Sequence, residues 1–132
     1  MEEKIKILVV DDDIDFINVT KMILENQNYE VVTASDKVEG MKVARSEKPQ
    51  LAILDVMMTT EQEGFEMARE LRQDPEFVTL PIILLTSVDT VTGMNFKDVA
   101  GDSEWMPVDA FIEKPVDSEN LIAEINKLLP KK

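Results

Sequence analysis

Acidic side chains directly follow two short apolar runs, and this arrangement could perform chemistry. Asp11 and Asp12 come after the run that ends at Val10, and Asp55 comes after the run that ends at Leu54. Carboxylates held about 5 Å apart, at an effective dielectric of about 20, repel each other by about 3 kcal/mol per pair. A cluster of them therefore calls for a cation. The chain has no histidine and no cysteine, and oxygen ligands alone favour Mg²⁺ or Mn²⁺ over zinc.

A hydroxyl and an ammonium follow two later apolar runs. Thr86 comes after Leu85, and Lys114 follows the short run that ends at Ile112. Phosphoryl transfer requires charge neutralisation at the three equatorial oxygens of the phosphoryl group. A metal ion, Lys114 and Thr86 could each take one of these oxygens, and an aspartate carboxylate can itself be the attacking group.

Apolar runs that suit buried strands alternate five times with helix-like patterns. The strands are expected over residues 5–10, 29–34, 51–54, 82–85 and 110–112. This alternation predicts an α/β fold, an open doubly wound sheet with helices on both faces. In such folds ligands bind beyond the carboxyl ends of the strands, so the polar residues at these ends are expected to share one edge.

Apolar residues at helical spacing predict which faces of the helices are buried. The expected stripes are Phe16–Val19–Ile23 with Ile17 and Leu24 beside them, Val38–Met41–Ala44, and Leu121–Ile122–Ile125–Leu128–Leu129. Asp36 and Glu39 predict a capping box at the second helix, and Asp117 or Ser118 is expected to cap the last one. Residues 87–107 have weak periodicity and predict at most a short or irregular helix.

Composition limits the classes of function. The chain has 132 residues and a net charge of −13, which disfavours direct binding to nucleic acid or to anionic lipid. Without cysteine there are no disulfides. The acidic start does not resemble a secretory signal, and no apolar stretch approaches membrane-spanning length. We expect one cytoplasmic domain over residues 1–132, with no output domain and no membrane partner.

Four motifs, in order and each at an expected strand end, carry a resemblance over essentially the whole chain. They are Leu8-Val9-Val10-Asp11-Asp12, Leu54-Asp55 with Met58, Leu85-Thr86-Ser87, and Lys114-Pro115. In these motifs the chain resembles the receiver domains of two-component response regulators, the CheY-like family. The resemblance implies a flavodoxin-like three-layer sandwich whose five-stranded parallel sheet has the order 2-1-3-4-5.

The resemblance also implies roles for the carboxylates. Asp55 corresponds to the phosphoryl acceptor, which becomes an aspartyl phosphate. Asp11, Asp12 and Asp55, together with the backbone carbonyl of Met57, correspond to the ligands of Mg²⁺ or Mn²⁺. The chain would then be a phosphoprotein in phosphorelay signal transduction, not an enzyme with a separate substrate.

The remaining implied roles concern the phosphoryl group and the signal. Lys114 corresponds to its cationic partner, and Thr86 with Phe111 to a switch that alters a partner-binding surface. The donor would be a histidine kinase or a histidine phosphotransfer protein, and the receiver of the signal a downstream effector. The motifs do not determine the oligomeric state.

Two features depart from the family pattern. Thr59 stands where a proline is common, and the usual glycine comes late, at Gly64. The span from Thr86 to Lys114 is longer than in compact receivers and contains Trp105. Its apolar residues either dock a partner or cover the edge of the sheet.

Two other functions compete with the receiver interpretation. The first is a receiver-like interaction module that is not phosphorylated. The second is a haloacid-dehalogenase-like phosphatase, but residues 11–15 lack the final Thr or Val of its D-x-D-x-[TV] pattern. An EF-hand beginning at Asp11 is excluded, since Phe16 and Met22 stand where it requires Gly and Glu.

Overall fold

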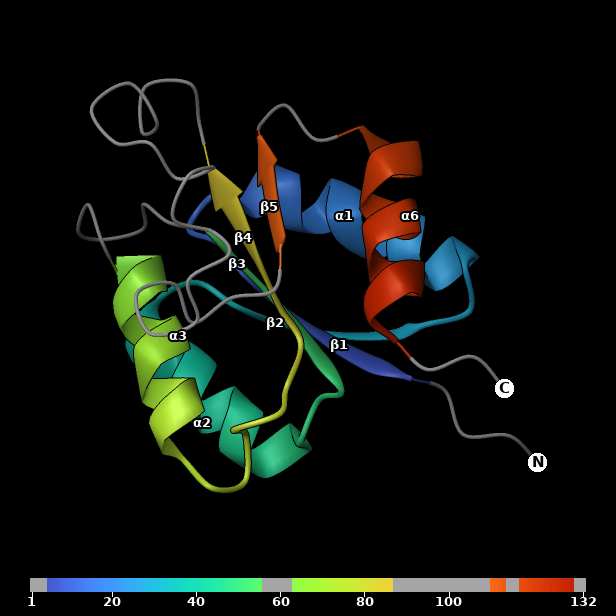
Figure 1. The fold of residues 1–132 in the computed structure, drawn as a ribbon. Helices are drawn as coiled ribbons and strands as arrows, with labels where there is room; N and C mark the ends of the chain where they lie inside the picture. The colour runs from blue at the N-terminus through green and yellow to red at the C-terminus, as the bar shows by residue number, and fades with distance from the viewer. Residues whose placement is uncertain (1–4, 56–62, 87–109, 114–116, 130–132) are drawn as a thin grey trace.

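The chain forms a parallel five-stranded sheet between two layers of helices (Figure 1). The computed structural model describes residues 5–55, 63–86, 110–113 and 117–129. Along the sequence the elements are β1 (Lys6–Val10), α1 (Ile14–Asn26), β2 (Glu30–Ala34), α2 (Lys37–Glu47), β3 (Leu51–Asp55), α3 (Glu63–Gln73), β4 (Ile82–Thr86), β5 (Ala110–Glu113) and α6 (Ser118–Leu128). The strand order is β2-β1-β3-β4-β5, which confirms the expected fold class. The irregular segment expected over 87–107 lies outside the described residues.

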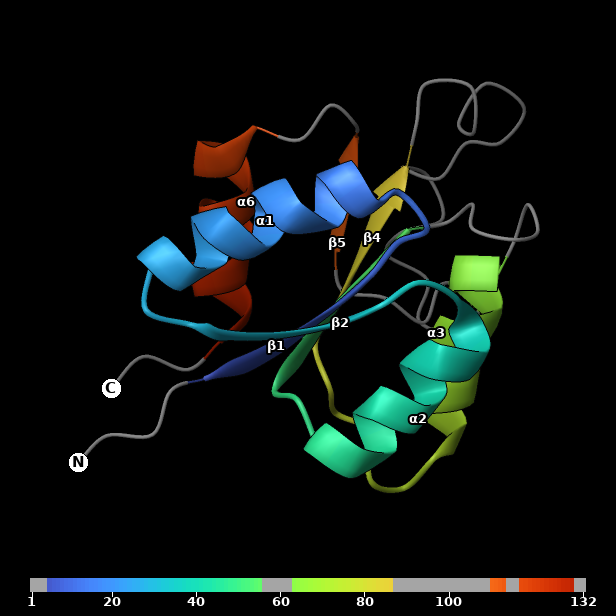
Figure 2. The ribbon, with the colours of Figure 1, turned by 180° about the vertical axis from the view of Figure 1, so that it is seen from behind.

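Helices cover both faces of the sheet, as Figures 1 and 2 show from opposite sides. On one face α1 and α6 pack over a core that includes Ile7, Val9 and Ile53. On the other face α2 and α3 pack over a core that includes Leu8 and Leu54. Successive residues of one strand thus point to opposite layers. Strands buried on both faces explain why the runs are continuously apolar.

The register of the central strands places the acidic residues side by side. Val10 of β1 pairs with Leu54 of β3, so Asp11 and Asp55 follow at the same level. Neighbouring strands lie about 4.8 Å apart, and residues at one level of a parallel pair point to the same face. The tertiary pairing, and not proximity along the chain, therefore brings these two carboxylates together.

The buried face of α1 confirms the expected Ile17 and Leu24 but not Val19. Ile17, Thr20 and Leu24 are buried, whereas Val19 is 58% exposed and Phe16 is only partly buried. Both sets have helical spacing, so periodicity could not separate them. The packing of α1 against the sheet and α6 selects the set that contains Thr20.

The start of α2 confirms Asp36 as a cap and corrects two details. The Asp36 side chain accepts a hydrogen bond from the Glu39 N–H at 2.8 Å. The Glu39 carboxylate does not return to Asp36 as in a standard capping box; it accepts from the Ser35 N–H at 2.8 Å. Val38 was expected to line the buried face but is 67% exposed. Gly40 takes part in the buried face instead, together with Met41 and Ala44.

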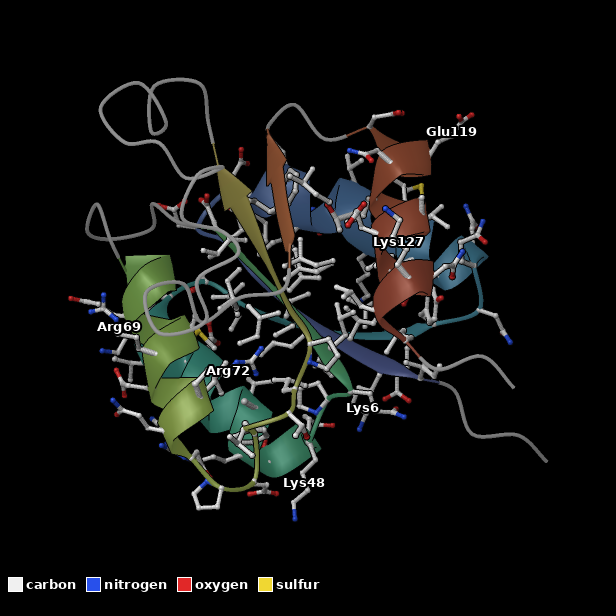
Figure 3. All side chains as sticks on the ribbon, in the orientation of Figure 1. Lys6, Lys48, Arg69, Arg72, Glu119 and Lys127 are labelled. Carbon is white, nitrogen blue, oxygen red and sulfur yellow. The ribbon has the colours of Figure 1, made fainter. Side chains whose placement is uncertain are left out.

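Arg72 holds the segment between α3 and β4 in place. Its guanidinium donates to the carbonyl oxygens of Phe77, Val78 and Leu80. Figure 3 shows Arg72 extending from α3 toward this segment, whereas Arg69 points away from the molecule. These hydrogen bonds fix the position of the chain just before β4.

The last helix confirms the stripe predicted from the sequence. Leu121 and Ile125 are fully buried, and the N-cap residue is Asp117, although its side chain makes no capping hydrogen bond. The Tyr29 hydroxyl, from the loop before β2, donates to Asn126 Oδ1 at 3.1 Å. None of the described helices combines the length and the apolar character needed to cross a lipid bilayer.

Candidate metal and phosphoryl site

Three carboxylates converge at the carboxyl edge of the sheet. Asp11, Asp12 and Asp55 each offer an oxygen, and these oxygens all lie within 4.8 Å of one another. Asp11 is fully buried and Asp55 is 7% exposed, whereas Asp12 is exposed to solvent. The cluster therefore combines two buried carboxylates with one that is exposed to solvent.

The spacing and the chemistry of the cluster fit a small divalent cation. Mg²⁺ binds oxygen at about 2.1 Å in octahedral geometry, so adjacent ligand oxygens lie about 3 Å apart and opposite ones about 4 Å. A set of oxygens within 4.8 Å of one another needs little adjustment to reach these separations. Carboxylates alone, with no imidazole or thiolate in the sequence, are the donors that Mg²⁺ and Mn²⁺ prefer.

Backbone hydrogen bonds position Asp11. Its N–H donates to the Ala34 carbonyl at 3.1 Å, which ties the end of β1 to the end of β2. Its Oδ1 accepts from the Asp13 N–H at 2.9 Å. A buried carboxylate held by an N–H group has a defined orientation.

Asp13 was not singled out as a functional residue from the sequence. It is the N-cap of α1, and its carboxylate accepts from the N–H groups of Asp15 and Phe16. The available signal was an aspartate just before a helical pattern, a strong N-cap residue type. Residue type alone does not show which of three consecutive aspartates caps the helix.

Several predicted site residues are described only in part. Met57 and Lys114 lie outside the described residues, and Thr86 and Phe111 are described only through their backbone in β4 and β5. Thr86 pairs with Glu113, the residue before Lys114, while Asp55 pairs with Leu85. The pairing carries the backbone of Thr86 and Glu113 to the edge of the sheet where Asp55 lies.

A pocket of about 580 Å³ lies at the opposite edge of the sheet. Lys48, Pro49, Phe77, Leu80 and Leu129 are among the residues that line it. It shares no residue with the acidic cluster, which is therefore a separate feature.

Comparisons with known proteins agree with this geometry. Residues 7–126 match the family model of the response regulator receiver domain. The chain is 36% identical over 124 residues to the alkaline phosphatase synthesis transcriptional regulatory protein PhoP of Bacillus subtilis, covering 94% of this chain and 48% of that protein. It is 31% identical over 124 residues to protein PilH of Pseudomonas aeruginosa, covering 94% and 97% of the two chains.

A solved structure extends the comparison to the fold. The chemotaxis response regulator CheY4 of Vibrio cholerae superposes with a TM-score of 0.81 at 25% identity, over 96% of this chain and all of that one. Among the curated relatives, the chain spans about half the length of PhoP but nearly the whole length of PilH. The family model, the curated relatives and the shared fold agree, and the chain belongs to the receiver domains of two-component response regulators.

Proposed function

We propose that Asp55 accepts a phosphoryl group from a histidine of a partner protein, in a Mg²⁺-dependent reaction. The observation that carries this proposal is the convergence of Asp11, Asp12 and Asp55 within 4.8 Å at the carboxyl edge of the sheet. Asp55 is assigned as the acceptor because it ends the central strand β3 and corresponds to the acceptor in the motifs shared with the receiver family. Asp11 and Asp12 would hold the metal with it, together with the backbone carbonyl of Met57.

The transfer is a substitution at phosphorus. One carboxylate oxygen of Asp55 attacks the phosphorus atom of the phosphohistidine, and an O–P bond forms while the N–P bond breaks. The imidazole nitrogen leaves with the bonding electron pair, so the partner's histidine is regenerated and no redox agent is needed. A bound Mg²⁺ would supply charge neutralisation at the phosphoryl oxygens. Lys114 would pair with a second oxygen, and the Thr86 hydroxyl would donate to a third.

The signal would leave the site through β4 and β5. Thr86 ends β4 and Phe111 lies in the neighbouring strand β5. A turn of Thr86 toward the phosphoryl group would change the space available to Phe111 and so alter a surface that a downstream effector binds. In this proposal the chain is a signalling acceptor that undergoes its own phosphorylation and dephosphorylation, and residues 1–132 act as one receiver unit.

Acetyl phosphate tests the acceptor directly. With Mg²⁺, intact-mass measurement is expected to show the gain of one phosphoryl group, which is absent in EDTA and in Asp55→Asn. Asp36→Asn is the matched control, because it makes the same acid-to-amide change at a cap on α2 and should be phosphorylated like wild type. An equal mass gain in Asp55→Asn would refute the acceptor assignment, and no gain in wild type would favour the unphosphorylated interaction module.

The exposed face of α1 is the surface that we propose the phosphodonor protein contacts. Ile14, Val19 and Met22 are 64%, 58% and 64% exposed, and α1 begins directly after the acidic cluster. A histidine that reaches Asp55 must bring its own protein against the surroundings of the site. Exposed apolar side chains there would be buried by such a contact.

This docking surface is tested with two donors. A Met22→Glu variant should accept phosphate from acetyl phosphate at the wild-type rate, because a small donor needs no docking. Transfer from a phosphorylated histidine kinase or phosphotransfer protein should slow about tenfold, which corresponds to about 1.4 kcal/mol. Val78→Glu, an exposed apolar position on the segment before β4, is the control. Unchanged transfer in Met22→Glu from every partner that phosphorylates wild type would refute this surface.

A further inference from the structure

We propose that Asp13 is a positioning residue for the metal site, because its cap on α1 holds the turn through Asp11 and Asp12 in the conformation that places their carboxylates beside Asp55. This inference rests on the proposed function, since it concerns the same metal site. Asp13 itself is not assigned as a ligand. It would act on the site through its neighbours and through the first turn of α1.

The side chain of Asp13 binds the start of α1 firmly. Its Oδ1 accepts hydrogen bonds from the Asp15 N–H at 3.0 Å and from the Phe16 N–H at 3.3 Å. Its carbonyl accepts from the Ile17 N–H at 3.0 Å, the first bond of the helix ladder. The backbone of Asp13 is extended, with φ −91° and ψ 104°, which is the usual conformation of an N-cap. These three bonds hold the side chain and the carbonyl of Asp13 against the first turn, and so place its Cα at the start of the helix.

On the side away from the helix, the backbone N–H of Asp13 holds the buried carboxylate of Asp11. This N–H donates to Asp11 Oδ1 at 2.9 Å, and Asp11 is fully buried. The nitrogen is bonded to the Cα that the cap holds, so the position of this donor depends on the cap. A rotation of the Asp13 backbone would therefore turn the donor away from Asp11, and it would also redirect Asp12, which lies between the two.

The same cap keeps a fourth negative charge out of the cluster. Among the carboxylates of the described segments, Asp11, Asp12 and Asp55 form the group within 4.8 Å, and Asp13 is not in it. Its charge lies against the N–H groups of the first turn, where the helix dipole is favourable to an anion. If the cap were lost, the Asp13 backbone could relax, and the ligand geometry would become less defined.

Mg²⁺ affinity separates this positioning role from a general effect on stability. Isothermal titration of the whole chain with MgCl₂ would compare wild type with Asp13→Ser, Asp13→Asn, Asp13→Ala and Asp13→Gly. Serine and asparagine keep a capping oxygen, so their Kd for Mg²⁺ should stay within about twofold of wild type. Alanine should weaken the affinity about tenfold, the lower end of the effect expected for groups that orient ligands.

Two variants keep the test valid if the alanine variant unfolds. Glycine at an N-cap lowers stability by only a few tenths of a kcal/mol relative to the good caps, yet it has no side-chain oxygen, so Asp13→Gly should also weaken Mg²⁺ binding. Asp36→Ala removes the equivalent cap of α2, which bonds the Glu39 N–H, and lies outside the cluster. It should lower the melting temperature, as Asp13→Ala does, and leave the Kd for Mg²⁺ unchanged.

The outcomes distinguish this inference from the proposed function. A wild-type chain that binds no Mg²⁺ would overturn both. A wild-type chain that binds Mg²⁺ while Asp13→Ala and Asp13→Gly bind it equally well would overturn the positioning role alone. Weakening in Asp13→Asn as large as in Asp13→Ala would show that the charge of Asp13, and not its cap, supports the site. Weakening in Asp36→Ala would show that loss of any cap has the same effect.

Discussion

Replacing Asp11 by asparagine is expected to stabilise the chain without metal and to remove its stabilisation by Mg²⁺. The change is nearly isosteric, and the amide oxygen can still accept the hydrogen bond from the Asp13 N–H, which is 2.9 Å long in the wild type. It removes one of three negative charges whose oxygens lie within 4.8 Å of one another. The perturbation is therefore electrostatic, with little change in packing.

The size of the effect follows from the two repulsions that Asp11 experiences. At about 5 Å and an effective dielectric of about 20, each pair is worth about 3 kcal/mol. The repulsion from Asp12 is discounted, because Asp12 is exposed and the two residues remain neighbours in the unfolded chain. Removing the repulsion from Asp55 is therefore the main gain. This gain is reduced by about 1 kcal/mol, because the Asp13 N–H makes a weaker hydrogen bond to a neutral amide than to a carboxylate. The net gain is about 2 kcal/mol, or about 6–10 °C in melting temperature for a domain of this size.

Thermal unfolding followed by circular dichroism measures the stability without metal in EDTA and the stabilisation by Mg²⁺ in MgCl₂. Wild type should gain about 2.7 kcal/mol when Mg²⁺ is at about one hundred times its Kd, and Asp11→Asn should gain much less. Asp36→Asn should change neither value. A variant that melts at or below the wild-type temperature in EDTA would refute the repulsion, and equal shifts with Mg²⁺ would refute Asp11 as part of the metal site.

Three further predictions concern packing and pH. Arg72→Gln should lower the free energy of unfolding by about 1–3 kcal/mol, because it removes hydrogen bonds from a charged donor to the segment before β4, whereas Arg69→Gln, on the exposed side of α3 (Figure 3), should change it little in the same urea titration. A Cβ at Gly40 would lie 2.9 Å from the end of the Met67 side chain. Gly40→Leu should therefore lower the free energy of unfolding by about 1–3 kcal/mol through overpacking. A free energy of unfolding equal to that of wild type would contradict this close packing. Burial raises the pKa of the Tyr29 hydroxyl above its usual range, so the folded chain holds this proton more tightly than the unfolded chain, and stability should fall as the pH rises above about 10; Tyr29→Phe should show a smaller fall, and an identical alkaline profile would exclude this origin.

The fold class and the three carboxylates of the cluster could be predicted from the amino-acid sequence. Apolar runs that are buried on both faces have no polar alternation, so each parallel strand could be recognised locally. Asp11, Asp12 and Asp55 stand directly after such runs, and the doubly wound topology implies a common edge. The order of the strands followed from the family resemblance and is confirmed by the pairing.

Where two local patterns are equally compatible with a helix, packing between distant parts of the chain determines which one is buried. Two stripes of α1 have the same period, and packing buried the one with Thr20 while Val19 stayed exposed. Among the aspartates that follow β1, the family resemblance assigned Asp11 and Asp12 to the metal, but the sequence did not identify Asp13 as the cap of α1. The register of β1 against β3 and the start of α1 assign Asp11 to the cluster and Asp13 to the cap, because these roles depend on the direction of each side chain, which long-range pairing sets.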